Sequence, residues 1–226
     1  MRTNNSKPRM TVNKLGEFLT ASPKKQRSIL TALKYPGENK FRFTGYNEAR
    51  RAIKNYLLNG CDNQILLDCI IALEAKDEDE KDNFTDSSIE ALTKVLESDK
   101  LDVEGFTYLP YEGDNPKLNI RGVEVSVYPD FIFHSESRGN EFTGAGKIHL
   151  SKDGYFGEEG GKYITTMIYS FVENHVDLAD RSIKHSNCIS YDVFTDSIAD
   201  CPRSIARRWQ NIEAGCENIT AIWDSI

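Results

Sequence analysis

The chain has 226 residues, of which 39% are hydrophobic and 28% are charged, and its formal net charge is −7. This length suffices for one large domain or for a small domain attached to a medium one, and the composition is that of an ordinary globular protein. No apolar run approaches the roughly 18–20 residues of a membrane span, and the polar start MRTNNSKPRM lacks the apolar core of a signal peptide. We therefore expect a cytoplasmic protein with no membrane partner.

Cysteine spacing and short motifs exclude several common classes of site. The five cysteines are widely spaced and form no C-x-x-C pair, so a zinc or iron–sulfur centre would need distant residues to converge. Buried, reduced thiols are the simpler expectation. The chain also lacks a G-x-S-x-G elbow, an H-E-x-x-H pair and a phosphate-loop motif, which leaves serine-hydrolase and zinc-protease interpretations without support.

The charge is distributed unevenly along the chain. Residues 1–54 contain thirteen Lys or Arg and three Glu, a local charge of +10, and the remaining 15 basic and 32 acidic residues give −17. A basic segment on an acidic chain is typical of a nucleic-acid contact surface, because each neutralised phosphate releases counterions. The alternative is a basic face that docks on the acidic remainder of the chain.

The first two predicted helices lie close together. Thr11 is placed to cap a short helix, and Ser22 followed by Pro23 starts a second helix that ends before Pro36. Two short helices joined in this way match a helix-turn-helix that reads DNA, and they match a plain helical hairpin equally well.

Two further helices are predicted over 46–58 and 63–76. On the first of them, Arg50, Arg51 and Lys54 project away from the apolar side. They are the best phosphate-contact candidates in this part of the chain, and ordinary solvated charges are the alternative.

The run KDEDEKDN at 76–83 has no apolar residue and marks the expected boundary of the helical part. We predict a basic helical region at 1–76, an acidic linker at 77–83 and an α/β domain at 84–226. The elements expected after the linker are a helix over 85–98, strands over 106–111 and 117–127, a hairpin, a glycine-rich loop over 154–161, a helix over 161–176, a strand over 187–194 and a helix over 204–223.

The hairpin carries the most informative side chains. Apolar and polar residues alternate along 122–153, and 137–140 interrupts them as a turn does. Asp130 begins one strand and Lys147 lies on its partner, so the pairing can bring both to the same edge of the sheet. A carboxylate beside a lysine suits metal-assisted phosphodiester cleavage, in which the carboxylate holds a divalent ion and the ammonium stabilises charge or orients water.

Pro129-Asp130, a spacer of fourteen residues and Ala145-Gly146-Lys147 together resemble the signature of the PD-(D/E)XK nuclease superfamily. The expected order helix, three strands, helix, strand, helix is similar to the order of the nuclease core. The resemblance implies an α+β (α/β) fold, in which a helical N-terminal region precedes a restriction-endonuclease-like mixed sheet flanked by helices.

The same resemblance implies roles for individual residues. Asp130 and Lys147 would be catalytic, Asp130 would hold Mg²⁺ with Glu90 as an extra ligand, and Lys152 would bind phosphate. The family has an acidic residue where this chain has Ala145. A replacement acid would have to come from elsewhere, and Glu90, Glu158 and Glu159 are the candidates.

Two histidines lie near these positions along the strands. His134 shares the strand face of Asp130, and His149 shares that of Lys147. Either would assist a metal or a leaving group, or would be structural.

The leading functional hypothesis is a nuclease-like protein that acts on DNA or RNA, in a bacterial restriction or antiphage system that the resemblance alone implies. The alternatives are a nucleic-acid or protein-binding module that has lost its chemistry, and a structural subunit of a defence complex. A protein partner or a homo-oligomer is compatible with each of them.

Overall fold

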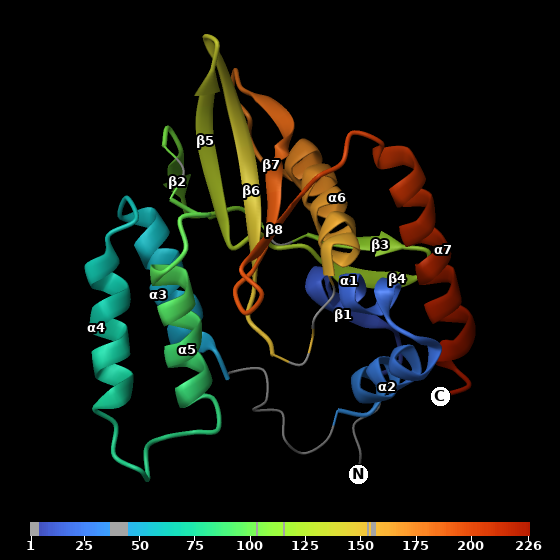
Figure 1. Ribbon diagram of the computed structural model, residues 1–226. Coiled ribbons are helices and arrows are strands. Elements are labelled where there is room, and N and C mark those ends of the chain that lie inside the picture. Colours follow the sequence, from blue (N-terminus) through green and yellow to red (C-terminus); the bar gives the residue numbers. More distant parts are fainter. Residues whose placement is uncertain (1–4, 37–44, 103, 115, 153, 155–156) are drawn as a thin grey trace.

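The computed structural model describes residues 5–36, 45–102, 104–114, 116–152, 154 and 157–226 (Figure 1). Within these residues the elements are β1 (Arg9–Thr11), α1 (Val12–Thr20), α2 (Pro23–Lys34), α3 (Asn47–Leu58), α4 (Asn63–Glu74), α5 (Thr85–Leu96), β2 (Thr107–Leu109), β3 (Lys117–Ile120), β4 (Val123–Ser126), β5 (Phe131–Ser137), β6 (Asn140–His149), α6 (Gly157–His175), β7 (Ser182–Asp192), β8 (Ser197–Asp200) and α7 (Ile205–Trp223). The fold is α+β, as expected, with helices followed by a mixed sheet. None of the described helices is long and apolar enough to span a membrane.

The helix starts follow local sequence signals. The Thr11 hydroxyl accepts the Lys14 N–H at 3.3 Å, which confirms Thr11 as the cap of α1, and Pro23 opens α2. The Asp62 carboxylate caps α4 in the same way by accepting the Gln64 N–H. These side chains satisfy N–H groups that the first turn of a helix leaves without intrahelical partners.

The larger sheet contains the predicted hairpin. Its strand order is β2-β5-β6-β7-β8, with β6 and β7 parallel and the other neighbours antiparallel. The turn between β5 and β6 is formed by Arg138 and Gly139, both with positive φ, as a two-residue hairpin turn matching the strand twist requires. The expected interruption at 137–140 is confirmed.

A smaller sheet corrects the expected single strand at 117–127. That segment forms two strands, β3 and β4, because Arg121 and Gly122 adopt positive φ and turn the chain back on itself. β4 also pairs in parallel with β1, which gives the order β1-β4-β3. An Arg-Gly turn lacks the usual Asn-Gly or Asp-Gly signal, and the three residues of β1 are too few to show a period.

Other boundaries moved for identifiable reasons. α6 begins at Gly157, inside the expected glycine-rich loop at 154–161, and residues 155–156 of that loop lie outside the described residues. β7 begins at Ser182, ahead of the expected 187, because Ser182 and Ile183 pair with Phe142 and Thr143 of β6. β8 was not expected at all.

The large sheet separates two hydrophobic cores (Figure 1). Helices α3 and α5 cover one face and share a core with Phe131, Phe133, Ile148 and Tyr191, and α4 packs on the outer side of these two helices (Figure 1). Helices α1, α6 and α7 and the small sheet enclose the other core, which includes Ala145. Both cores combine residues from before and after 77–83, so this acidic segment connects two packed helices, α4 and α5, and not two separate cores.

Candidate functional site

Asp130 lies immediately before β5 and is held against β6 by two backbone contacts. Its N–H donates to the Gly146 carbonyl at 2.8 Å, and its Oδ2 accepts the Ile148 N–H at 2.9 Å. A Cβ at position 146 would lie 2.1 Å from the ring of Phe131, so the close approach of the chain here requires glycine. The Asp130 side chain is consequently fixed in position and only 5% exposed.

Three cationic side chains surround this carboxylate. Lys147 Nζ lies 3.2 Å from Oδ2, Arg50 Nη1 lies 3.1 Å from the same atom, and Lys54 Nζ lies 4.0 Å from Oδ1. Arg50 and Lys54 are four residues apart on α3 and therefore lie on one helix face. We call Asp130, Lys147, Arg50 and Lys54 the cationic cluster; its three positive charges and one negative charge sum formally to +2.

Electrostatics keep the Asp130 carboxyl ionised. Burial by itself would raise its pKa, but Lys147, Arg50, the Ile148 N–H and Lys54 outweigh burial and lower the pKa below its usual range. Burial lowers the pKa of Lys147, and the Asp130 charge opposes that shift. Lys147 Nζ also donates to the Tyr128 carbonyl at 2.8 Å, so its position is fixed by two partners.

Side chains from α1 and α3 both reach the end of β6. The Ile148 carbonyl accepts Arg50 Nη1 at 3.0 Å and Asn13 Nδ2 at 3.4 Å. One turn further along α1, the buried Glu17 carboxylate pairs with Lys14 at 2.5 Å and with Lys25 at 3.5 Å. The cationic cluster is therefore continued by two more lysines on α1 and α2.

Two other buried polar residues lie at the same end of the sheet. His149 is aligned with Asp192 across β6 and β7. Burial lowers the pKa of His149, although Asp192 and Glu17 oppose the shift. The Asp192 carboxylate accepts the N–H groups of Phe194 and Thr195, which form the turn after β7. Asp192 therefore stabilises the turn that follows β7.

The residues around Asp130 do not fit a magnesium ion. Mg²⁺ is held by oxygen ligands in near-octahedral geometry. The described contacts of the Asp130 carboxylate are all with hydrogen-bond donors, and Ala145 contributes a fully buried methyl group to the core. In the described part of the chain, no three His, Cys, Asp or Glu side chains are grouped so that they could hold a metal.

The replacement acids proposed from the sequence are engaged elsewhere. Glu90 and Lys152 form a 2.5 Å ion pair with both side chains nearly half exposed, so Glu90 is a surface partner of Lys152 and not a second ligand beside Asp130. Glu158 and Glu159 pair with Lys162 at the start of α6, and Glu159 also pairs with Arg208.

The predicted phosphate contacts divide into separate groups. Arg50 and Lys54 come together at Asp130, whereas Lys152 pairs with Glu90. Arg51 lines a groove of about 320 Å³ between α3 and α4. His134 lies further along β5 in the field of Arg181 and Glu141, and burial lowers its pKa.

Sequence reasoning missed Asn13, Lys14 and Glu17 as parts of this site. A partial signal was present in the sequence, since Glu17 directly precedes the apolar Phe18 within a short predicted helix. A buried carboxylate requires cationic partners, and Lys14 is three residues away on the same helix.

All five cysteines are free thiols, as expected, and three of them are buried.

Comparison with known proteins adds no assignment: no family model, no curated protein and no solved structure matches the chain.

Proposed function

We propose that the chain binds nucleic acid through the cationic cluster and does not cleave it by a metal-dependent reaction at Asp130. The observation that carries this proposal is one buried carboxylate held by three cations, with no second acidic ligand among its described contacts. Of the functions considered from the sequence, this geometry favours the binding module that has lost its chemistry.

Arg50 and Lys54 of the cationic cluster have hydrogen-bond donors that face solvent. The side chains of Arg50 and Lys54 are 31% and 32% exposed. Both described contacts of Arg50 use Nη1, and a guanidinium has further donors on Nη2 and Nε in a fork that matches phosphate oxygens. A local charge of +2 on a chain of net charge −7 concentrates attraction for anions at this edge of the sheet.

Extension along α1 and α2 favours a polyanion over a single small anion. Lys14 and Lys25 flank Glu17 with side chains 39% and 51% exposed, and they continue the positive charge beyond the cluster. A sugar-phosphate backbone presents successive negative charges to such a row, and each one neutralised releases counterions.

Asp130 acts here as an organiser of cations. A dication at its carboxylate would have to displace Arg50 and Lys147 and would then lie next to three positive charges, which is unfavourable in a buried site. The order of α5, β2, β5, β6, α6 and β7, with β3 and β4 inserted, supports the nuclease-like scaffold that the sequence motif implied. A role in restriction or antiphage defence stays a prediction from that resemblance.

The test is nucleic-acid binding by Arg50→Ala/Lys54→Ala. Fluorescence anisotropy with labelled DNA and RNA, in EDTA and over a range of salt, should show weaker binding to all sequences. The slope of log K against log salt should fall by about 2, since each duplex phosphate contact contributes about 0.9. Arg51→Ala is the matched control, because the neighbouring arginine lines a different groove and should leave the slope unchanged.

Two results would overturn the proposal. One is the absence of nucleic-acid binding by the folded wild-type chain, which would redirect attention to a protein partner. The other is cleavage that requires Mg²⁺ or Mn²⁺, stops in EDTA and is lost in Asp130→Asn. Circular dichroism of each variant separates loss of binding from loss of fold.

A further inference from the structure

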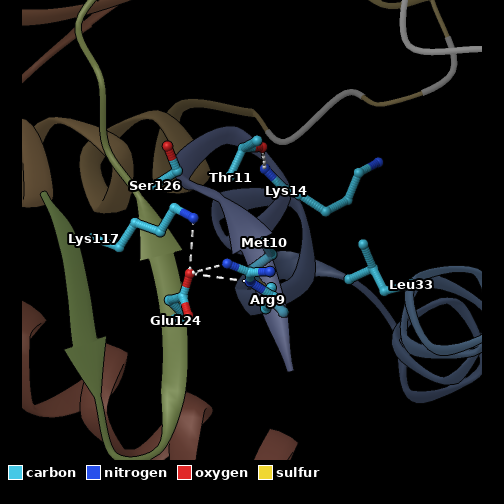
Figure 2. Close-up of a pocket in the computed structure, with 8 residues that line it drawn as sticks. All are labelled: Arg9, Met10, Thr11, Lys14, Leu33, Lys117, Glu124 and Ser126. Carbon is cyan, nitrogen blue, oxygen red and sulfur yellow. Dashed lines mark hydrogen bonds and ion pairs between the residues drawn. The ribbon is translucent and has the colours of Figure 1, made fainter. Parts of the chain in front are cut away.

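A pocket of about 250 Å³ opens between the small sheet and the first two helices (Figure 2). It is lined by β1 and the start of α1, by Leu33 of α2 and by the neighbouring strands β3 and β4. The lining residues are Arg9, Met10, Thr11, Lys14, Leu33, Lys117, Glu124 and Ser126.

The charged side chains of this pocket are predominantly cationic. Glu124 Oε1 accepts Arg9 Nη2 at 2.7 Å and lies 3.0 Å from Lys117 Nζ, and the hydrogen bonds from Arg9 and Lys117 lower the pKa of Glu124. With Lys14, the lining carries three positive charges and one negative charge, again a formal +2. Figure 2 shows Arg9 and Lys117 converging on Glu124, with Lys14 extending to the other side of Met10.

The remaining walls are apolar and the space is small. Met10 and Leu33 supply hydrophobic side chains, and Thr11 and Ser126 supply hydroxyl groups. Pockets for drug-sized ligands usually have volumes of about 300–1,000 Å³, so this one suits a smaller group. An apolar slot beside cations is complementary to an aromatic ring that carries a phosphate.

Lys14 connects the pocket to the cationic cluster. It lines the pocket and also pairs with Glu17, while the preceding residue, Asn13, shares the Ile148 carbonyl with Arg50. A strand whose phosphates lie on Arg50 and Lys54 can therefore continue past α1 to the pocket.

We propose that this pocket receives one unpaired nucleobase of a bound single strand, with one adjoining phosphate on Arg9 and Lys117 and the other on Lys14. The inference rests on the proposed function and adds a specific expectation. The chain should prefer strands with unpaired bases over a fully paired duplex, because a base inside a duplex is not free to enter the slot.

The experiment fills the pocket and leaves the cationic cluster intact. Leu33→Trp places a large side chain at the wall, and Leu67→Trp on the exposed face of α4 is the matched control. Anisotropy titrations should use a labelled single strand, the corresponding duplex and adenosine 5′-monophosphate as a competitor. A second variant, Lys117→Ala, removes a cation without adding bulk.

Leu33→Trp should weaken single-strand binding about tenfold, because one base is shut out of its apolar contacts with Met10 and Leu33, and should leave duplex binding within about twofold. Lys117→Ala should weaken single-strand binding less, and Leu67→Trp should change neither. Single-strand binding that is unchanged in both Leu33→Trp and Lys117→Ala would overturn the pocket assignment while leaving the proposed function in place.

Two further outcomes are distinguishable. If the monophosphate binds wild type but not Leu33→Trp, and single strand and duplex bind equally, the pocket takes a free nucleotide and the strand assignment is overturned. If wild type binds neither strand nor duplex, the proposed function fails and this inference fails with it.

Discussion

Asp130→Asn should destabilise the fold substantially, because it removes the counter-charge of three cations while changing shape very little. Removing one partner of a buried ion pair costs about 3–5 kcal/mol. Arg50 and Lys54 are about one-third exposed and can rehydrate, whereas the Lys147 side chain is only 15% exposed. We therefore expect the lower end, about 3 kcal/mol, which for a chain of this size is roughly 6–12 °C in Tm.

The assay is urea unfolding at pH 7 followed by circular dichroism, with the midpoint shifted and the m-value unchanged. Glu141→Gln is the control, because Glu141 pairs with Arg181 at the surface and its side chain is 59% exposed. Its cost should be below about 1 kcal/mol. The double variant Asp130→Asn/Lys147→Met should recover part of the loss, since it removes the most buried unpaired cation. A cost for Asp130→Asn no larger than that of the control would refute the reasoning.

Three other outcomes follow from the same structure. The Asp130 carboxyl has a lowered pKa in the folded state, so the stability it contributes is present above the unfolded-state pKa of about 3.9 and is lost as pH falls below it. In urea titrations, the difference in unfolding free energy between wild type and Asp130→Asn should stay constant from pH 7 to 5 and narrow below about pH 4. A difference still constant at pH 3 would contradict this. Gly144→Ala places a Cβ 2.1 Å from the backbone carbonyl oxygen of Asn187, so it should lower the free energy of unfolding by about 1–3 kcal/mol in thermal unfolding. A variant as stable as wild type would argue against this packing. Glu90→Gln breaks an exposed pair and should change stability by less than about 1 kcal/mol and nucleic-acid affinity not at all; loss of Mg²⁺-dependent activity in this variant would restore Glu90 as a ligand.

Local signals were sufficient for most helices and for the hairpin. Helical periodicity, the Thr11 cap and a proline at the first helical position, Pro23, predicted α1 and α2. Strand alternation predicted that Asp130 and Lys147 share one edge. These features depend on residues near one another in sequence or directly across a two-residue turn. The pairing of β5 and β6 then fixes the relative positions of the two side chains.

The partners of Asp130 on α3 could not be predicted in this way. Arg50 was recognised as an exposed cation with an affinity for phosphate, but its contact with Asp130 spans 80 residues of sequence and depends on how α3 packs on the sheet. The sequence motif predicted a metal at Asp130, because a carboxylate beside a lysine is typical of metal-assisted phosphodiester cleavage. Tertiary packing supplied an arginine at the position where a metal would bind.

The most direct test of the account is nucleic-acid binding by Asp130→Asn, measured by anisotropy in EDTA and again in Mg²⁺, at a temperature where circular dichroism shows the variant folded. If Asp130 organises cations that bind phosphate, neutralising it raises the formal charge of the cluster from +2 to +3. Affinity should then be retained or increased, equally in EDTA and in Mg²⁺. If Asp130 instead holds a metal ion that nucleic acid requires, wild-type binding will depend on Mg²⁺ and will be lost in Asp130→Asn, and that result would contradict the central claim.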